Sequence, residues 1–321
     1  RPPGVVMGWV PPISCTRIGA AHRRRGQPSQ DAAVTRTFRS GDGQSVAVMA
    51  VADGHGHPLH RLSDVGSRLA CSVAIEAVRT ELGSASIPLR GGHGGWELWL
   101  AEDLPVTIHA GWLAAIREHW EQLAGKGQDL PREAGPPVPQ GPGMPDAARR
   151  VPPQGEFSPL LYGTTLGLVV MTPAWWGMTG IGDWDLLRLA DNGPGLLISE
   201  ENPEAAPGET TFSLCMEGAS EFFAERAALE ELPQEGQGFH LLLSTDGVRK
   251  SCHCVADFVM LAQYLTAAAD QDGGNHITDP AAGARKLEPE LDRITQQGSG
   301  DDVSVALGRW METGTGPQPG C

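Results

Sequence analysis

The hydrophobic residues of this chain fall into two kinds of segment. The first kind is a short, continuous apolar run that ends at a glycine or an acidic residue, which is typical of a buried β-strand. The clearest example is 45–53, SVAVMAVAD, which is rich in small and β-branched residues and ends at Asp53. Further strands are predicted at 163–171, 175–182, 185–190, 240–244 and 303–309.

The second kind is longer and carries apolar residues every three or four positions, as an amphipathic helix does. One such segment runs from Ser63, a candidate N-cap, to Gly83. Another covers 96–124, where Trp112 and Trp120 share a face. Helical spacing also appears at 254–268 and near 219–231, whereas 84–95 reads as a Gly-rich loop.

The predicted strands come in clusters with helices between them, not in a regular alternation of strand and helix. This order favours an α+β layered fold with mainly antiparallel sheets. We expect one domain over 13–310, an N-terminal extension over 1–12 and a disordered tail over 311–321. Two regions break the pattern, a Pro/Gly-rich stretch near 125–158 that predicts a mobile insertion and a mixed, acidic region near 191–236.

Composition narrows the classes of function. The 321 residues carry a formal net charge of −15, which argues against unspecific binding to nucleic acids or anionic membranes. No apolar run reaches the length of about 18 residues that a membrane-spanning helix needs. The start has no signal-peptide pattern and no Met, so residues upstream are expected to be missing. Six cysteines are too sparse for a disulfide framework, and we expect a cytoplasmic protein.

Four acidic motifs stand at the ends of strand-like runs. Asp53 and Asp246 each follow an apolar strand and precede glycine, Asp183 follows Gly182 in a strand–turn–strand segment, and Asp301 precedes the last strand. A single Asp-Gly is usually only a turn, but four such placements predict carboxylates that converge. Oxygen ligands favour Mg²⁺ or Mn²⁺, and two such ions about 3.5–4 Å apart would generate a hydroxide nucleophile from a shared water.

The ordered motifs resemble the metal-dependent protein phosphatases of type 2C, and in particular a bacterial branch with a Gln-Asp-Ala opening. The resemblance spans about 17–309 and rests on Gln30-Asp31-Ala32, Asp53-Gly54-His55-Gly56, Tyr162-Gly163-Thr164-Thr165, Gly182-Asp183, Ser244-Thr245-Asp246-Gly247 and Asp301-Asp302-Val303-Ser304. It implies a four-layer α-β-β-α sandwich, in which two antiparallel sheets are flanked by helix pairs and metals lie in a cleft at one end. The region 191–236 lies where family members carry a variable flap.

The resemblance also implies roles for the acidic residues. Asp53 would bridge two metals, with the carbonyl of Gly54 on one of them. Asp246 and Asp301 would hold the other metal. Asp183 matches a residue that helps to bind a third, weaker metal in bacterial members.

The remaining site residues include two departures from the family pattern. His55 matches the residue proposed as the general acid for the leaving alkoxide. Gln30 stands where family members have Glu, so the site loses one negative charge; we expect either weaker metal affinity at that position or a ligand role taken partly by Asp31. The usual phosphate-binding Arg is replaced by glycine; Arg25 or Arg23 is the candidate substitute, with a solvated basic patch as the equal alternative.

Other chemistry-bearing residues have simpler interpretations. His55, His57 and His60 have spacing compatible with a zinc site, but His55 already has a role and the other two are expected to line the cleft or face solvent. Cys252-His253-Cys254 has no second Cys pair and is interpreted as surface or packing residues. Ser244 lacks the Gly-x-Ser-x-Gly surroundings of a serine nucleophile.

We therefore expect Mg²⁺- or Mn²⁺-dependent hydrolysis of phosphoserine and phosphothreonine in proteins, by a hydroxide held at a two-metal site with a possible third weak ion. The expected partner is a phosphoprotein substrate, phosphorylated by a Ser/Thr kinase, and the chain is expected to be a monomer. Two alternatives stay open: a catalytically weak pseudophosphatase that acts as a binding module, and a phosphomonoesterase for small molecules.

Overall fold

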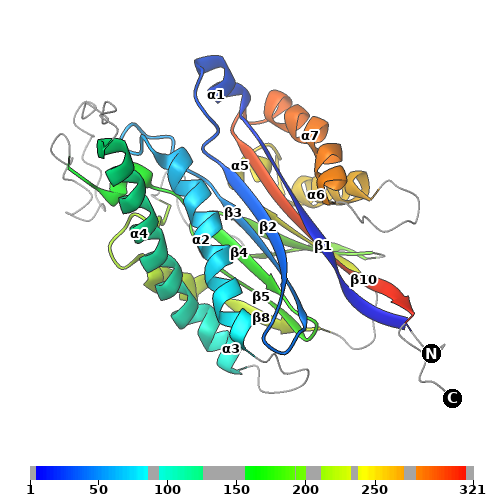
Figure 1. Cartoon of the computed structure of the whole chain (residues 1–321). Helices are drawn as coiled ribbons and strands as arrows, with labels where there is room; N and C mark the ends of the chain where they lie inside the picture. Colours follow the sequence, from blue (N-terminus) through cyan, green and yellow to red (C-terminus); the bar gives the residue numbers. More distant parts are fainter. Residues whose placement is uncertain are drawn as a thin grey trace.

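Two antiparallel five-stranded sheets stack face to face in the part of the computed structural model that is described, residues 5–85, 94–125, 156–191, 193–199, 211–232, 238–270 and 280–315 (Figure 1). The first sheet has the order β1 (Val5–Arg17), β10 (Val303–Thr315), β9 (Phe239–Ser244), β6 (Asp185–Ala190), β7 (Gly195–Ser199). The second has the order β2 (Ala32–Arg39), β3 (Ser45–Ala52), β4 (Leu166–Met171), β5 (Trp175–Ile181), β8 (Ala228–Glu231).

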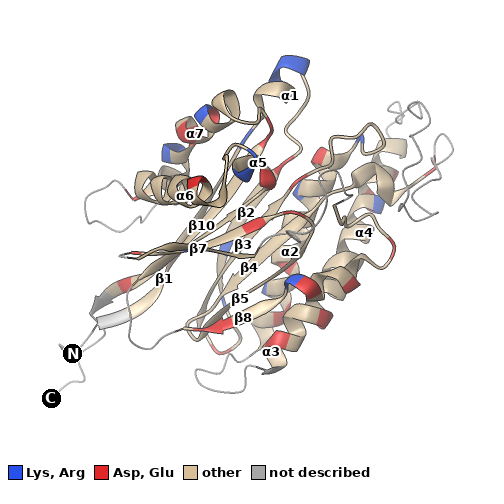
Figure 2. Cartoon of the chain, turned by 180° about the vertical axis from the view of Figure 1, so that it is seen from behind, with Lys and Arg blue, Asp and Glu red and all other residues tan. Residues whose placement is uncertain are grey.

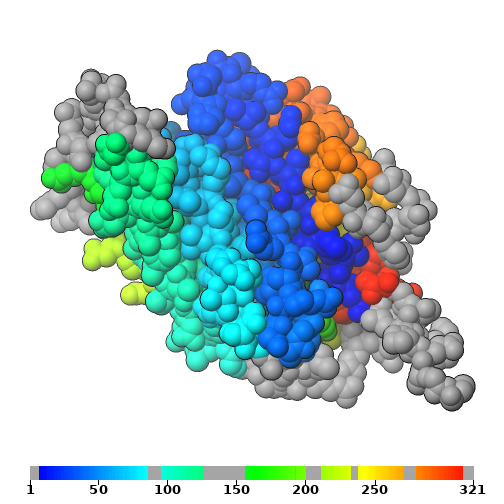
Figure 3. All heavy atoms as spheres, in the orientation of Figure 1, coloured from blue at the N-terminus to red at the C-terminus, as the bar shows by residue number. Residues whose placement is uncertain are grey.

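Helices cover the outer face of each sheet. The second sheet is covered by α2 (Ser63–Ser84) and α4 (Leu104–Gly125), which lie side by side in Figures 1 and 3, and the first by α6 (Val255–Ala269) and α7 (Pro280–Gln297). Shorter elements are α1 (Ala20–Arg25), α3 (Gly94–Leu98), the π-helical η1 (Trp99–Asp103), the 3₁₀ helices η3 (Pro159–Tyr162) and η4 (Ala219–Arg226), and α5 (Asp246–Arg249). The predicted α+β sandwich of four layers is confirmed.

Burial on both faces explains why β3 is apolar throughout. Val48 and its even-numbered neighbours pack toward the helix layer, whereas Met49 and its odd-numbered neighbours pack between the two sheets. Successive side chains of a strand point to opposite faces, so a strand in the middle of a layered fold needs apolar residues at every position. This burial fixes the end of β3, and with it the position of Asp53.

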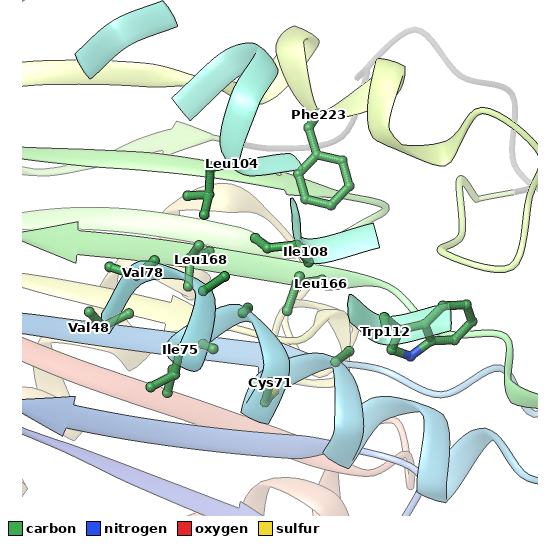
Figure 4. Packing of buried hydrophobic residues seen from close by; sticks show 14 of the residues in the cluster. Val48, Cys71, Ile75, Val78, Leu104, Ile108, Trp112, Leu166, Leu168 and Phe223 are labelled. Atoms are coloured by element: carbon green, nitrogen blue, oxygen red, sulfur yellow. The ribbon is translucent and has the colours of Figure 1, made fainter. Parts of the chain in front are cut away.

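The helix layer packs on the second sheet through large side chains. Figure 4 shows Val78 of α2 near Leu168 of β4 and Ile108 of α4 near Leu166 of β4, and all four are buried. Trp112 of α4 is also fully buried, and its indole Nε1 donates a hydrogen bond to a backbone carbonyl of α2. These contacts hold α2 at a fixed depth above the sheet.

The structure differs from the prediction at both ends of the chain. Residues 5–12 belong to β1, so the predicted N-terminal extension is wrong beyond its first residues, and β10 continues to Thr315 into the predicted tail. The strand was not predicted because Pro11 and Pro12 cannot donate backbone hydrogen bonds, which argues against a strand. The two prolines are tolerated because β1 is an edge strand and its register shifts between Val10 and Ile13.

Other local predictions need correction. Ser63 is the first residue of α2 and not its N-cap, and its hydroxyl instead accepts a hydrogen bond from a distant side chain. The helix predicted near 219–231 is the short η4 followed by β8. The elements β2, β7 and α7 were not predicted. Most of the predicted insertion near 125–158 lies outside the described residues, and no helix among the described ones is long and apolar enough to cross a membrane.

A pair of glycines in α2 tests this packing. A Cβ atom at Gly66 would lie 2.0 Å from the carbonyl oxygen of Tyr162, whereas a Cβ at Gly83 meets nothing within 4 Å. Gly66→Ala should therefore lower the free energy of unfolding by about 1–3 kcal/mol, as overpacking does. Gly83→Ala should raise it by up to about 1 kcal/mol through helix propensity. Denaturant unfolding of both variants measures the difference; equal stabilities would contradict the packing of α2 against η3.

Candidate active site

A cavity of about 1130 Å³ lies at the end of the sandwich where β3 and β9 end and β10 begins. Its lining includes His22, Gln30, Asp53, Gly54, His55, His57, His60, His109, Leu113, Leu160, Asp183, Thr211, Ser213, Cys215, Met216, Asp246, Lys250 and Asp301. The four carboxylates predicted to converge, Asp53, Asp183, Asp246 and Asp301, are all among these residues. The structure thus brings all four to the lining of one cavity.

Sheet register brings Asp246 and Asp301 together. Asp246 follows β9 directly, at the start of α5, and Asp301 precedes β10. These strands pair antiparallel with Val305 opposite Ser244, so the end of one strand lies beside the start of the other. The approach is close, because a Cβ atom at Gly247 would lie 2.0 Å from the carbonyl oxygen of Asp302. Glycine after Asp246 therefore serves backbone packing as much as turn chemistry.

Asp183 is held in the turn between β5 and β6. Gly182 before it has φ +87°, a left-handed conformation that favours glycine. Arg226 fixes the turn from outside: its guanidinium donates to the carbonyl oxygens of Gly182 and Trp184 and lies 3.7 Å from the centre of the Trp184 ring. Thr211 donates a hydrogen bond of 3.1 Å to the carboxylate of Asp183.

Asp302, which sequence reasoning did not single out, organises the loop that carries Gln30. Its carboxylate accepts hydrogen bonds from the backbone N–H groups of Gly19 and Gln30, and it lies 2.9 Å from Nδ1 of His22. Asp302 is 3 % exposed, so these donors replace water. The adjacent pair Asp301-Asp302 was the available signal: one carboxylate lines the cavity, and the other holds the wall behind it.

Gln30 and Asp31 have different surroundings. Gln30 lines the cavity, and its Nε2 donates to the hydroxyl of Ser63 at 2.7 Å, which leaves Oε1 as a neutral oxygen on the side of Gly56. Asp31 is buried and is not among the lining residues; it accepts a 2.6 Å hydrogen bond from Thr245. Of the two, only Gln30 is placed to face a ligand.

The two candidate arginines do not reach the cavity. Arg23 pairs with Asp292 of α7 at 3.2 Å, and Arg25 is exposed at the end of α1. Neither is among the lining residues, and Figure 2 shows the basic residues of α1 at the tip of the molecule. The structure therefore does not bring either arginine to the predicted phosphate position. Arg23 is held instead by Asp292 of α7, a helix that was not predicted.

Lys250 is a site residue that sequence reasoning missed. Its Nζ lies 2.6 Å from Oδ2 of Asp246 and 3.1 Å from Oδ2 of Asp301. Lys250 comes four residues after Asp246 on the turn of α5, the spacing at which helical side chains meet. That spacing was the signal, and acidic and basic residues do adjoin at α5 in Figure 2.

The histidines form one wall of the cavity. The rings of His55 and His60 lie 4.9 Å apart, and Nδ1 of His60 donates to the carbonyl oxygen of Leu160 at 2.6 Å. Burial lowers the pKa of His55, although Asp183 opposes the shift, and burial lowers the pKa of His60 to about 4. Burial therefore disfavours the charged form of both rings in the metal-free protein. His57 is exposed at the rim.

The sequence matches a known protein family over most of its length. The sequence profile described as Protein phosphatase 2C matches residues 18–288, which is most of the chain. The chain belongs to the protein phosphatase 2C family. No curated protein sequence matches it.

Solved structures with a similar fold include other phosphatases. A bacterial serine phosphatase aligns with a TM-score of 0.51 at 14 % identity, over 94 % of this chain and 97 % of that one. Stp1 from Staphylococcus aureus, a serine/threonine phosphatase, aligns with a TM-score of 0.50 at 15 % identity, over 95 % and 96 %. The catalytic domain of PstP, in complex with two manganese ions, aligns with a TM-score of 0.47 at 16 % identity, over 96 % and 100 %. Likeness at these identities concerns the fold alone.

In this phosphatase 2C domain, the carboxylates of the cavity repel one another. Burial and then the charge of Asp31 and other neighbours raise the pKa of Asp53 well above its usual range. Burial and then Asp183 raise the pKa of Asp246 to about 7, although Lys250 lowers it. Negative charge is thus costly here unless a cation balances it.

The donor atoms of the cavity are of the type that a hard divalent cation prefers, but the side chains described there do not yet surround one cation position. Oxygen donors predominate, and Oδ1 of Asp246 is buried without a hydrogen-bond partner, as a ligand atom would be. Within the described ranges, however, no three His, Cys, Asp or Glu side chains already converge on a cation position. This also gives no support to a zinc site at the histidines. Cys254 is exposed, in keeping with a surface role for the Cys-His-Cys run.

The raised pKa of Asp246 predicts the direction of a pH effect in the metal-free protein. The unfolded chain releases this proton near pH 4, whereas the folded chain keeps it to about pH 7. The folded state therefore binds more protons across this window, and the free energy of unfolding should fall as pH rises through it.

Denaturant unfolding in chelator, between about pH 5 and pH 7, measures this slope. The variant Asp246→Asn has no proton to release at this position and should show a shallower decline than the unsubstituted chain. Parallel curves would contradict the burial of Asp246 beside Asp183.

Proposed function

We propose that this chain hydrolyses phosphoserine and phosphothreonine in proteins with the help of Mg²⁺ or Mn²⁺. The observation that carries the proposal is the convergence of Asp53, Asp183, Asp246 and Asp301 at one cavity of a phosphatase 2C domain. Membership of the family supports a phosphatase, and the carboxylates supply the reason for a divalent cation.

The proposed roles follow from position and charge. Asp53, Asp183 and Asp246 would hold the cation, and Gln30 offers a neutral oxygen beside them. A bound Mg²⁺ or Mn²⁺ lowers the pKa of water and offsets the charge of a phosphate. Asp302 and Arg226 keep the carboxylate-bearing loops in place through backbone hydrogen bonds.

The shape of the cavity supports a substrate larger than phosphate. Its volume of about 1130 Å³ includes an apolar wall that contains Leu113, Leu160 and Met216. This volume leaves room for a phosphorylated side chain together with flanking residues. The substrate protein would present its phosphorylated residue with the phosphate toward the carboxylates, after a Ser/Thr kinase has added it.

A catalytically weak phosphoprotein-binding module is the second candidate. Arg23 and Arg25 lie away from the cavity, and Lys250 contacts two of the predicted metal ligands. A domain without a cationic phosphate clamp would bind or turn over phosphate esters weakly. The following measurement also separates this candidate from a working phosphatase.

Hydrolysis of p-nitrophenyl phosphate should depend on Mn²⁺ concentration and should fall at least about a hundredfold in Asp246→Asn, because the substitution removes a charge from the cation site. The fold should survive, since Asp246 lies at the cavity and already resists full ionisation. Asp103→Asn removes an exposed carboxylate away from the cavity and is the matched control. Mn²⁺-independent turnover, or full activity of Asp246→Asn, would refute the proposal; no turnover in a folded protein favours the binding module.

His55→Ala tests the proposed proton donor. A phosphoserine peptide has a poor leaving group that needs a proton, whereas nitrophenolate leaves without one. The variant should therefore lose about ten- to a hundredfold more activity on the peptide than on p-nitrophenyl phosphate. Steady-state kcat on both substrates gives the ratio. Equal losses would assign His55 a structural role beside His60.

A further inference from the structure

The ammonium group of Lys250 occupies a position that the resemblance gives to a metal. Asp246 and Asp301 are the pair expected to share one divalent cation, and Nζ of Lys250 lies within 2.6 and 3.1 Å of one oxygen of each. Both contacts join an ammonium group to a carboxylate oxygen, so charge strengthens them. A cation in contact with the same two oxygens would compete with Nζ for them.

The surrounding backbone holds Lys250 in this place. Its N–H donates to the carbonyl oxygen of Asp246 at 2.8 Å, which closes the turn of α5. Ser251, the next residue, donates to the carbonyl oxygen of Gly247 at 2.9 Å. The turn therefore projects the lysine stem from a fixed base, one helical turn from Asp246, toward the start of β10. Among the described lining residues, Lys250 is the one Lys or Arg side chain.

Asp246 presents its two oxygens differently. Oδ2 contacts Lys250, whereas Oδ1 is buried and has no hydrogen-bond partner. An unpaired carboxylate oxygen in a buried place is costly, so Oδ1 is the oxygen of Asp246 that a cation would stabilise most. Asp53 and Asp183 are nearby carboxylates that interact electrostatically with Asp246. The remaining ligand capacity therefore lies on the side of Asp246 away from Lys250.

We propose that Lys250 is a built-in replacement for one of the two divalent cations, so that the chain binds a single Mg²⁺ or Mn²⁺ on the side of Oδ1 of Asp246, where Asp53 and Asp183 also line the cavity. The inference rests on the proposed function, which assigns these carboxylates to metal binding. One ammonium and one divalent cation would place three positive charges among the four carboxylates Asp53, Asp183, Asp246 and Asp301. A second divalent cation between Asp246 and Asp301 would meet the ammonium at contact distance.

Counting bound Mn²⁺ tests this replacement without reference to activity. The chelator-treated chain is dialysed against Mn²⁺, and bound metal per chain is measured for the unsubstituted protein, Lys250→Ala and Lys250→Gln. We expect one ion in the unsubstituted protein and two in both variants, because either substitution removes the ammonium. Lys286→Ala removes a lysine of α7, away from the cavity, and should still bind one. Paramagnetic resonance should show spin coupling between two Mn²⁺ ions only in the Lys250 variants.

The outcomes separate this inference from the proposed function. Two ions in the unsubstituted protein, or one ion in both Lys250 variants, would overturn the replacement and leave metal-dependent phosphatase activity intact. No ion in any folded variant would refute the metal site itself, and with it the proposed function. The use of two Lys250 variants guards against the loss of one through misfolding, which circular dichroism would reveal.

Discussion

Mutual repulsion among carboxylates in a half-buried cavity is the constraint around which this end of the molecule is built. Asp53, Asp183 and Asp246 come from three separate strand ends, and burial raises the pKa of Asp53 and of Asp246. A fold that gathers such groups without a cation has a lower free energy of unfolding. The rest of the sandwich must therefore be rigid enough to hold them together, and the buried faces of β3 and β9 provide that rigidity.

Residues behind the carboxylates convert strand ends into a defined site. Asp302 fixes the loop of Gln30 through two backbone N–H groups, and Arg226 fixes the turn of Asp183 through two carbonyl oxygens. In both cases a charged side chain satisfies backbone groups that irregular loops would otherwise leave without partners. The carboxylates of the cavity thus have few hydrogen-bond partners, whereas the residues behind them, Asp302 and Arg226, have several. Such an arrangement keeps the ligand atoms in place while leaving them available to a cation.

The sequence predicted those features that local patterns encode. The strand 45–53 was visible because burial on both faces leaves only apolar residues, and Asp53 was visible because it ends that strand. The helix α7 was missed although Leu287 and Leu291 stand four residues apart, and the true places of Arg23 and its partner in α7 were missed with it. Contacts across distant segments depend on register and helix docking, which no local pattern contains. The edge strand β1 was hidden by prolines that only an edge position tolerates.

Lys250 shows the same limit within the site. Its spacing from Asp246 is local and could be read from the sequence, but its approach to Asp301 depends on the pairing of β9 with β10. A lysine beside one carboxylate is an ordinary surface ion pair of small value. A lysine shared by two carboxylates at a cation site changes the charge balance of the whole cavity, because it supplies half the charge of a divalent ion and cannot dissociate from the chain. The carboxylate motifs of this family can therefore remain intact while one nearby side chain changes the charge that a cation would meet there.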